Sequence, residues 1–388
     1  MRFSHRVDPS NPNPIAVAQR AARAQGHSLR ALNDSNPTHH GLAPDALPET
    51  YAADPRGPLA SREALAAFLG DGARAGDLYL LDSTSQAYAW LMMLMCDPGD
   101  AVLAPKPGYP LIESIARLTG VDAINYQLRY DGSWTIDTAA LAALLDGAEG
   151  ARVRALVLIN PNNPTGSYVK PDEREAIVDL CRAHGVALIA DEVFFGYTLE
   201  PFDGNRRLAG EDRVLTFALD GLSKALAAPH AKVGWIRVSG PADEVAEAKA
   251  RLDIIADDFL PWGAPTDRML PGLLAEVAGR RDAVRERTRA NLATLHAMLA
   301  GDGLGVTDVL RAEGGWNMLL RFPATIDENA LVLDLIDHDG ATGQPGYFFD
   351  MAANGYLALS LLPEPGEFAA NVSLVLGAVR RALAPDMP

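Results

Sequence analysis

One lysine, together with the residues that accompany it, carries the chemistry of this sequence. Lys224 follows the apolar run 214–218, which has the composition of a buried β-strand. A lysine amine forms a Schiff base with an aldehyde only in its neutral form, so its site must be desolvated or cationic and lower its pKa. Most lysines that follow a strand are solvated, so the residues around Lys224 decide whether it is a catalytic lysine.

Asp191 is the first of these residues. It follows the apolar run 186–190, and an acid at the end of a buried strand needs a cationic or hydrogen-bonding partner. A pyridinium nitrogen would serve, because the carboxylate would keep that nitrogen protonated and the ring able to accept electrons. A helix cap or a turn aspartate is an equally good interpretation of Asp191 taken alone.

Three loops offer further contacts. The segment Asp82-Ser83-Thr84-Ser85 lies between a predicted strand and a predicted helix, where amides and hydroxyls form either an anion site or an ordinary helix cap. The segment 160–166, Asn-Pro-Asn-Asn-Pro-Thr-Gly, is a turn in any fold, and a cis peptide is possible at either Asn-Pro bond. Tyr109 lies in the turn 107–110, although an isolated aromatic is more often a core residue.

Taken in order, these segments resemble the class I/II pyridoxal-phosphate-dependent aminotransferases, which have the aspartate aminotransferase-like fold. The resemblance covers about residues 30–360. It implies pyridoxal phosphate as the cofactor, Lys224 as the Schiff-base lysine, and a homodimer with shared active sites. It assigns the other contacts as follows: Asp191 at the pyridinium nitrogen, Asn163 at the ring hydroxyl, Tyr109 stacked on the ring, Ser83, Thr84, Ser85 and Lys232 at the phosphate, and Tyr51 at the phosphate of the neighbouring subunit.

Four positions depart from the pattern of this family. Lys232 stands where an arginine usually grips the phosphate, so the charge is kept but the bidentate fork is lost. Phe194 stands where a tyrosine usually donates to the ring hydroxyl, and Gly221 stands where a serine often touches the phosphate. Ala358 stands where the resemblance predicts the arginine that binds the substrate's α-carboxylate.

The alanine at position 358 leaves three explanations open. Another cation binds the carboxylate, the substrate lacks an α-carboxylate, or the predicted register is displaced by a strand; we favour the first. The candidate substrate contacts are Asn36, His39, His40 and Arg321. Arg321 is equally well interpreted as a surface charge, and the histidines as solvated loop residues.

The elements that must position these residues alternate regularly. Predicted strands at 78–81, 101–104, 153–159, 186–190, 214–218 and 233–238 are separated by predicted helices such as 61–69, 86–95, 111–118 and 171–184. This alternation predicts an α/β fold whose large domain, residues 50–283, has a mostly parallel sheet covered by helices on both faces. A smaller α+β domain is expected from residues 284–388 and 1–49, with a long connecting helix near 284–299, a strand at 318–322 and helices at 12–26 and 367–383.

The composition of the chain limits the classes of protein to which it can belong. The 388 residues are 48% hydrophobic and 22% charged, as in a globular protein of two domains. A net charge of −16 argues against a nucleic-acid partner, and no apolar run suits a membrane span or a secretory signal. The two cysteines, Cys96 and Cys181, form neither a disulfide framework nor a metal pattern. We therefore expect a cytoplasmic protein without a metal site.

The sequence thus predicts an enzyme that moves an amino group between an amino acid and a 2-oxo acid by a ping-pong mechanism. Lys224 would act as general base and acid in the proton shift. A lyase, decarboxylase or cyclase on the same scaffold is the main alternative, since cofactor and fold serve several reactions. A non-catalytic cofactor-binding protein is a weaker one.

Overall fold

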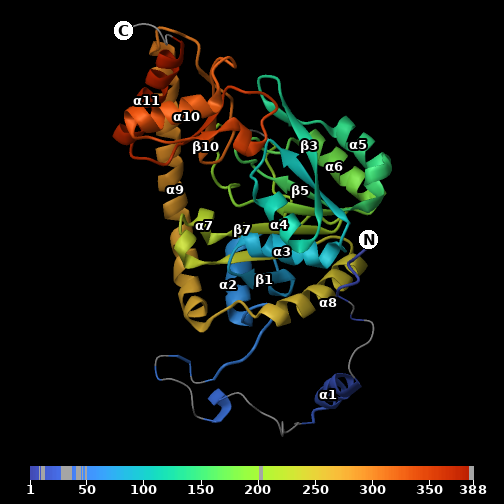
Figure 1. Ribbon diagram of the computed structural model, residues 1–388. Coiled ribbons are helices and arrows are strands. Elements are labelled where there is room, and N and C mark those ends of the chain that lie inside the picture. The colour runs from blue at the N-terminus through green and yellow to red at the C-terminus, as the bar shows by residue number, and fades with distance from the viewer. Residues whose placement is uncertain are drawn as a thin grey trace.

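A computed structural model describes residues 1–7, 9, 14–27, 37–40, 45, 47–48, 50–200 and 204–383. Its centre is an eight-stranded sheet whose strands follow the spatial order β1-β8-β7-β6-β5-β2-β3-β4 (Figure 1). In that order they are β1 (Leu78–Leu81), β8 (Gly234–Ser239), β7 (Thr216–Gly221), β6 (Ala187–Asp191), β5 (Val153–Ile159), β2 (Ala101–Lys106), β3 (Asp122–Tyr130) and β4 (Trp134–Ile136).

The five central strands, from β7 to β3, pair in parallel, whereas β8, β1 and β4 join antiparallel at the two edges. Parallel neighbours require crossover connections, and the helices that supply them are buried on both faces of the sheet. The helices of this layer are α2 (Leu59–Leu69), α3 (Thr84–Met95), α4 (Leu111–Thr119), α5 (Thr138–Asp146), α6 (Pro171–His184) and α8 (Ala242–Phe259). The predicted mostly parallel sheet with helices on both faces is therefore confirmed.

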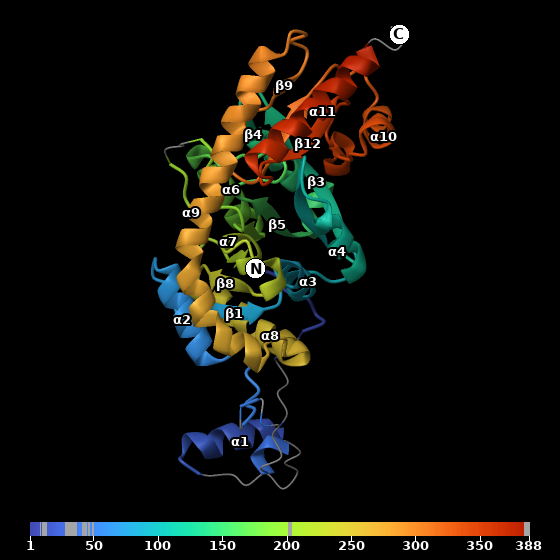
Figure 2. The same ribbon diagram turned by 90° about the vertical axis from the view of Figure 1, so that its left-hand side faces the viewer.

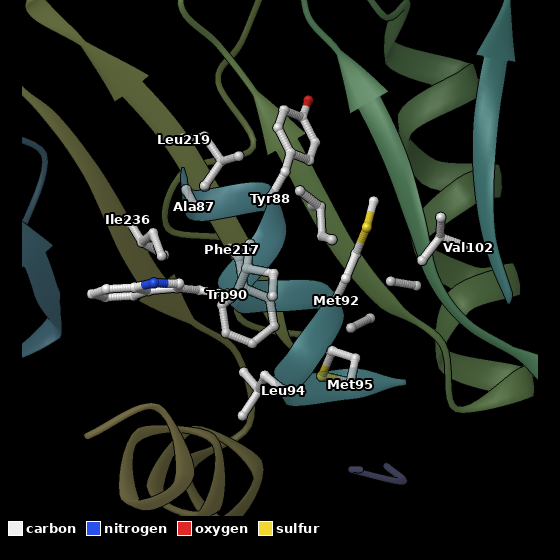
Figure 3. Close-up of a cluster of buried hydrophobic side chains, with 14 of the residues drawn as sticks. Ala87, Tyr88, Trp90, Met92, Leu94, Met95, Val102, Phe217, Leu219 and Ile236 are labelled. Carbon is white, nitrogen blue, oxygen red and sulfur yellow. The ribbon is translucent and has the colours of Figure 1, made fainter. Parts of the chain in front are cut away.

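One face of the sheet is covered mainly by α3 and α8. Figure 3 shows the apolar side chains of α3, among them Trp90 and Leu94, packed over Phe217, Leu219 and Ile236 of the sheet. Helix α3 is apolar on nearly every side because it lies between the sheet and other helices. Tyr88 lies at the end of this cluster, with its phenol oxygen pointing away from it (Figure 3).

The opposite face carries α5 and α6, whose residues form a second apolar cluster with alternate residues of β2, β5 and β6. The two cysteines are fully buried, Cys96 within the first cluster and Cys181 within the second. Burial raises the pKa of the Cys96 thiol to about 12 and also raises the pKa of Cys181.

A smaller antiparallel sheet follows in the C-terminal part, with the spatial order β11-β12-β10-β9. Its strands are β11 (Gln344–Pro345), β12 (Tyr356–Ser360), β10 (Asn317–Arg321) and β9 (Asp308–Val309). Helices α10 (Glu328–Asp339) and α11 (Pro365–Leu383) pack on it (Figures 1 and 2). The predicted small α+β layer is therefore confirmed.

Helix α9 (Ala264–Gly301) runs along both units, as both views show (Figures 1 and 2). Its first half packs on α2 and the edge of the large sheet through Leu270, Leu274 and Val277. Its second half packs on the small sheet through Leu292 and Leu295. The predicted boundary between residues 283 and 284 falls inside this continuous helix and stays a prediction.

The N-terminal segment was expected in the small domain, and for residues 1–7 this is wrong. Val7 belongs to the apolar cluster beneath α3 and α8, with Met1 and Phe3 packed against it. Ser4 donates to Asp97 at 2.7 Å, which ties the segment to the end of α3. Helix α1 (Pro14–Ala24) also lies far from α10 and α11 in both views (Figures 1 and 2).

Six shorter elements complete the described part of the chain. They are the four-residue helix α7 (Leu222–Ala225) and the 3-10 turns η1 (Pro37–His40), η2 (Ala75–Asp77), η3 (Ala148–Arg152), η4 (Pro229–Ala231) and η5 (Gly346–Phe349). Among the described residues, no helix combines the length and apolar character that crossing a bilayer would need. The same residues contain no group of three or more His, Cys, Asp or Glu side chains arranged to hold a metal ion.

Candidate active site

A cavity of about 440 Å³ lies at the carboxyl ends of the central strands. Asn163 reaches it from the loop after β5, Asp191 from the last position of β6, and Lys224 from α7, directly after β7. Ligands of open parallel sheets bind at this edge, because loops from successive strands meet there. We call it the catalytic-lysine cavity; its polar and aromatic lining also includes Ser83, Thr84, Ser85, Tyr88, Tyr109, Phe194, Lys232, Trp316, Asn317 and Gln344.

Lys224 is half-buried among aromatic rings. Its Nζ lies 5.6 Å from the ring centre of Phe194 and 5.4 Å from that of Trp316. Burial lowers the pKa of the Lys224 amine, and the negative charge of Asp191 acts in the opposite direction. The hydroxyl of Tyr197 donates to the backbone carbonyl of Lys224, which fixes the start of the side chain. This environment favours the neutral, nucleophilic amine.

Asp191 is a buried carboxylate without an ion pair among the described residues. It accepts a hydrogen bond from the Tyr88 hydroxyl at 3.0 Å and another from the amide of Val193 at 3.2 Å. Burial raises the pKa of Asp191 to about 6, while these two hydrogen bonds partly oppose the shift. A buried acid with this pKa gains stability from a cation placed against it.

Asn163 lies in the loop 160–166, where both Asn-Pro bonds are cis, as the sequence allowed. Its Oδ1 accepts a hydrogen bond from Nδ2 of Asn317 at 3.0 Å. The loop ends at Gly166, whose φ is +68° and where an added Cβ would lie 2.5 Å from the carbonyl oxygen of Gly314. Only glycine fits there, so the loop is pressed against the segment that leads into β10.

The anion-binding end of the cavity is the start of α3. Ser83 is the N-cap, and its hydroxyl accepts from the amide of Gln86 at 3.3 Å, so the simpler cap interpretation holds for this side chain. The residues after it, Thr84 and Ser85, face the cavity at the positive end of a 12-residue helix. Lys232 lies at the rim in a left-handed conformation with φ +51°, which is uncommon for a lysine.

Gly221 has a steric reason for replacing the expected serine. It pairs with Gly234 across β7 and β8, and an added Cβ at 221 would lie 2.8 Å from the carbonyl oxygen of Val233. Gly234 is itself crowded, since its Cβ would lie 3.0 Å from the backbone of Ser83. The two glycines let β8 approach the start of α3 closely.

Tyr109 lines the cavity from the turn after β2 and is exposed in the single chain. The turn is anchored on both sides. The amide of Gly108 donates to the carbonyl of Phe349 at 3.1 Å, and the buried Lys106 pairs with Glu113 and, at 2.5 Å, with Asp350. The small domain therefore holds the loop that carries Tyr109.

The structure does not bring the remaining predicted residues to this cavity. Arg321 on the inner strand β10 pairs with Asp308 on the edge strand β9 at 2.5 Å and does not line this cavity, which favours the surface-charge interpretation. Tyr51 and His39 are exposed and do not line the cavity of the single chain. Asn36 and the side chain of His40 lie outside the described residues.

Four of the lining residues that the sequence analysis did not identify bear on the chemistry of the site. They are Tyr88, Trp316, Asn317 and Gln344. Tyr88 is the third residue after Ser85, on the first turn of a helix that the analysis had identified, so the signal was present. The other three lie on or beside short strands of the small sheet, and a single polar residue on a two- or five-residue strand gives no recognisable pattern.

The residues present fit pyridoxal phosphate. The cavity has the size usual for small cofactors. It offers a lysine of lowered pKa, a buried carboxylate that has no ion pair among the described residues, and a helix start for an anion. Asn163 is within reach of the same space. In that order, the lysine suits an aldehyde, the carboxylate a pyridinium nitrogen, the helix start a phosphate, and Asn163 a ring hydroxyl.

The fold is aspartate aminotransferase-like. Among solved structures, an alanine aminotransferase from Pyrococcus furiosus superposes with a TM-score of 0.76 at 18% identity, covering 95% of this chain and 96% of that one. An aspartate aminotransferase double mutant from Thermus thermophilus gives 0.72 at 23% identity, covering 97% and 100%. At these identities the likeness concerns the fold.

The family follows from the sequence comparison. The model of the family Aminotransferase class I and II matches residues 48–361, so the chain belongs to this family and is a transaminase. An alanine aminotransferase of Mycobacterium tuberculosis is 27% identical over 377 residues, which span 92% of this chain and 87% of the relative. Membership of the family implies pyridoxal phosphate as the cofactor.

Proposed function

We propose that this chain uses pyridoxal phosphate bound covalently to Lys224 to move an amino group between an amino acid and a 2-oxo acid in a ping-pong cycle. One observation carries the proposal: an amine of lowered pKa, Lys224, and a buried carboxylate without an ion pair among the described residues, Asp191, face one cavity. Such a pair suits a cofactor that brings an aldehyde and a cationic ring nitrogen.

Bound pyridoxal phosphate supplies an electron sink for the pair left when a proton leaves the substrate carbon. The Lys224 amine takes that proton and returns it at the cofactor carbon, because its lowered pKa matches both roles. Asp191, oriented by Tyr88, balances the positive charge of the ring. Phe194 has no hydrogen-bond donor, so Asn163 binds the ring hydroxyl without help from that position.

The remaining contacts hold the cofactor in place. The amides and hydroxyls of Thr84 and Ser85, with the cap at Ser83, bind the phosphate together with Lys232. Tyr109 stacks on the ring from the loop after β2. In the homodimer that we propose, Tyr51 of each copy contacts the phosphate bound by the other, which accounts for its exposure in the single chain.

Replacing the lysine tests the proposal directly. We expect Lys224→Ala to remove the visible absorbance of the lysine-bound cofactor and to lower kcat by about a thousandfold or more, because both the covalent link and the proton carrier are lost. Lys249→Ala is the matched control, since Lys249 pairs with Asp77 outside the cavity. Retained turnover in Lys224→Ala contradicts the proposal.

The same assay separates transamination from the other reactions of this scaffold. We expect one equivalent of amino donor to become its 2-oxo product while the bound cofactor changes to its pyridoxamine form, and a 2-oxo acid to reverse the change. Release of ammonia or carbon dioxide, with the cofactor spectrum restored in each cycle, would identify a lyase or a decarboxylase instead.

A further inference from the structure

One face of the small sheet carries Asn317 and Gln344, which line the catalytic-lysine cavity, and it is neutral at its centre, while Arg321 at its far end pairs with Asp308. Ala358 on β12 pairs directly with Gln344 on β11 and with Leu319 on β10. Register partners lie on the same face of a sheet, and so do residues two positions apart on a strand. Asn317 is therefore on this face too, and its contact with Asn163 shows that the face points toward the cavity.

A second cavity of about 540 Å³ lies beside Ala358, between β12 and the helices α10 and α11. We call it the small-domain cavity. Asn317 and Gln344 line both this cavity and the catalytic-lysine cavity, so the two spaces are adjacent at these side chains. Apolar side chains form much of its inner wall, among them Leu335, Leu357, Phe368 and Val375.

The linings of the two cavities carry little positive charge. Among the described residues that line them, the cationic side chains are Lys224 and Lys232, both assigned to the cofactor. The ionisable residue of the small-domain cavity is Asp339, an acid that pairs with Arg381 at 2.5 Å. A carboxylate beside Ala358 would thus give up contacts with water without gaining a cation from the described lining.

We infer that the amino donor carries an uncharged substituent, not a free carboxylate, on the side of its reacting carbon that faces Ala358. The substituent extends past Asn317 and Gln344 into the small-domain cavity. The inference rests on the proposed function and narrows its amino donor to compounds whose reacting amine lies beside an amide-type or apolar group. The terminal amine of a longer amino acid, or an amino acid amide, has this form.

Neutral hydrogen-bonding groups are available for such a substituent. The Gln344 side chain makes no hydrogen bond to other described residues, so its amide can both donate and accept. The indole N–H of Trp316, beside Asn317, is buried without a partner in the part of the chain that the structure describes. An amide in the substrate satisfies such groups, whereas leaving a buried donor unpaired costs binding energy.

In the half-reaction, the donor exchanges its amine nitrogen for an oxygen and becomes a carbonyl compound. The cofactor aldehyde gives up its oxygen for that nitrogen and gains the proton and electron pair of the donor's C–H bond. No outside oxidant is needed, and a second substrate reverses the exchange. The substituent beside Ala358 takes no part in this balance and affects only binding and orientation.

Three matched donors test the inference on the holoenzyme: L-alanine, L-alaninamide and N-benzyl-L-alaninamide. The readout is the rate at which the absorbance of the lysine-bound cofactor is lost. We expect kcat/KM to be at least tenfold higher for each amide than for L-alanine, with the benzyl compound at least equal to the simple amide. L-Alanine reacting as fast as the amides, while the cofactor absorbance is normal, overturns the inference and leaves the proposed function standing.

Variants at position 358 separate charge from volume. We expect Ala358→Arg to raise kcat/KM for L-alanine about tenfold or more, because the guanidinium would start on the face of Asn317 and pair with the carboxylate. Ala358→Leu fills the opening without charge and should slow the benzylamide alone. Leu333→Arg, an exposed position on α10, is the control for an added arginine. An arginine at 358 that favours the amides contradicts the inference.

Calorimetry with unreactive analogues decides the matter without catalysis. Propionate, propanamide and N-benzylpropanamide are titrated into the wild-type holoenzyme. We expect the benzylamide to bind at least tenfold more tightly than propionate; the reverse order overturns the inference. Absence of the cofactor absorbance from the preparation would instead count against the proposed function, so the two failures are distinguishable.

Discussion

The two ends of the catalytic-lysine cavity are built by different means. The cofactor end, on the large sheet, uses charge: Asp191 and Lys224 both have pKa values shifted by burial, and Lys232 lies at the rim. The substrate end, on the small sheet, uses neutral amides beside Ala358, namely Asn317 and Gln344. Under the proposed function, the first end binds a cofactor whose chemistry is fixed, and the second end determines which amino donor fits.

This difference explains why family membership says much about the first end and little about the second. Each group at the cofactor end has a required complement, because an unpaired charge in a buried site is costly. At the substrate end a neutral lining imposes no such requirement, so it can vary with the donor. The predictions below perturb the charged end first and then the junction between the two.

The largest effect is expected at the charged end, from Asp191→Asn. Removing one member of a buried charge pair costs about 3–5 kcal/mol, which corresponds to roughly a hundredfold to several thousandfold loss. We expect cofactor affinity and kcat to fall by that range, while N-benzylpropanamide binds any remaining holoenzyme as before. Cofactor titration and steady-state kinetics measure both. Equal losses of cofactor and benzylamide affinity would break the proposed separation of the two ends.

The same variant has the opposite effect on the cofactor-free chain. Because burial raises the folded-state pKa of Asp191 to about 6, ionising it destabilises the cofactor-free fold progressively from about pH 4 to pH 6. Asp191→Asn removes this penalty. We expect the cofactor-free variant to be more stable than wild type by about 1–3 kcal/mol above pH 6 and equally stable below pH 4.

Denaturant unfolding at pH 4, 5, 6 and 7 measures this crossover. With added cofactor, wild type should be more stable than the variant at pH 7, because the bound ring cation pairs with an ionised carboxylate only in wild type. A cofactor-free variant less stable than wild type at pH 7 would mean that Asp191 already has a cationic partner in the protein.

Lys232 offers a smaller change at the phosphate. Lys232→Ala removes a charge-assisted contact that is exposed in the single chain, so we expect about a tenfold weaker cofactor affinity. Lys232→Arg keeps the charge and supplies the bidentate fork, and should match or exceed wild type. Donor preference should be the same in both variants. A changed ratio of L-alaninamide to L-alanine rates would link this residue to the substrate end.

The smallest effect is expected at the junction, where Asn317 donates to Asn163. Losing one neutral hydrogen bond costs about 1 kcal/mol, so Asn317→Ala should lower kcat/KM for L-alaninamide roughly fivefold. It should also shift the absorbance maximum of the bound cofactor, because Asn163 would then face the ring hydroxyl alone. Unchanged spectra and kinetics would show that the two ends do not communicate through this contact.

The sequence predicted most of the elements of the large sheet that position the cofactor end. Strands 78–81 and 153–159 and helix 171–184 were correct to the residue, because strands buried on both faces are continuous apolar runs and the helix has Pro171 at its start and Gly185 at its end. The loops after these strands then carried recognisable motifs.

Other elements were missed for physical reasons. Strand β3, next to the edge strand β4, has only two buried residues, Tyr126 and Leu128, among exposed and half-buried ones, and α8 contains many charged residues with a weak apolar face. The substrate end was the least predictable. Its residues are brought together by the register of β10, β11 and β12, and strand register cannot be deduced from two- to five-residue segments.

The deep burial of both thiols has a practical consequence. Cys96 and Cys181 are the chain's two cysteines, and with raised pKa values they hold little thiolate at neutral pH. Alkylating reagents therefore find no ready target in the native fold. A cysteine introduced at an exposed position would react alone, so fluorescent or spin labels can be attached site-specifically without first removing the natural ones.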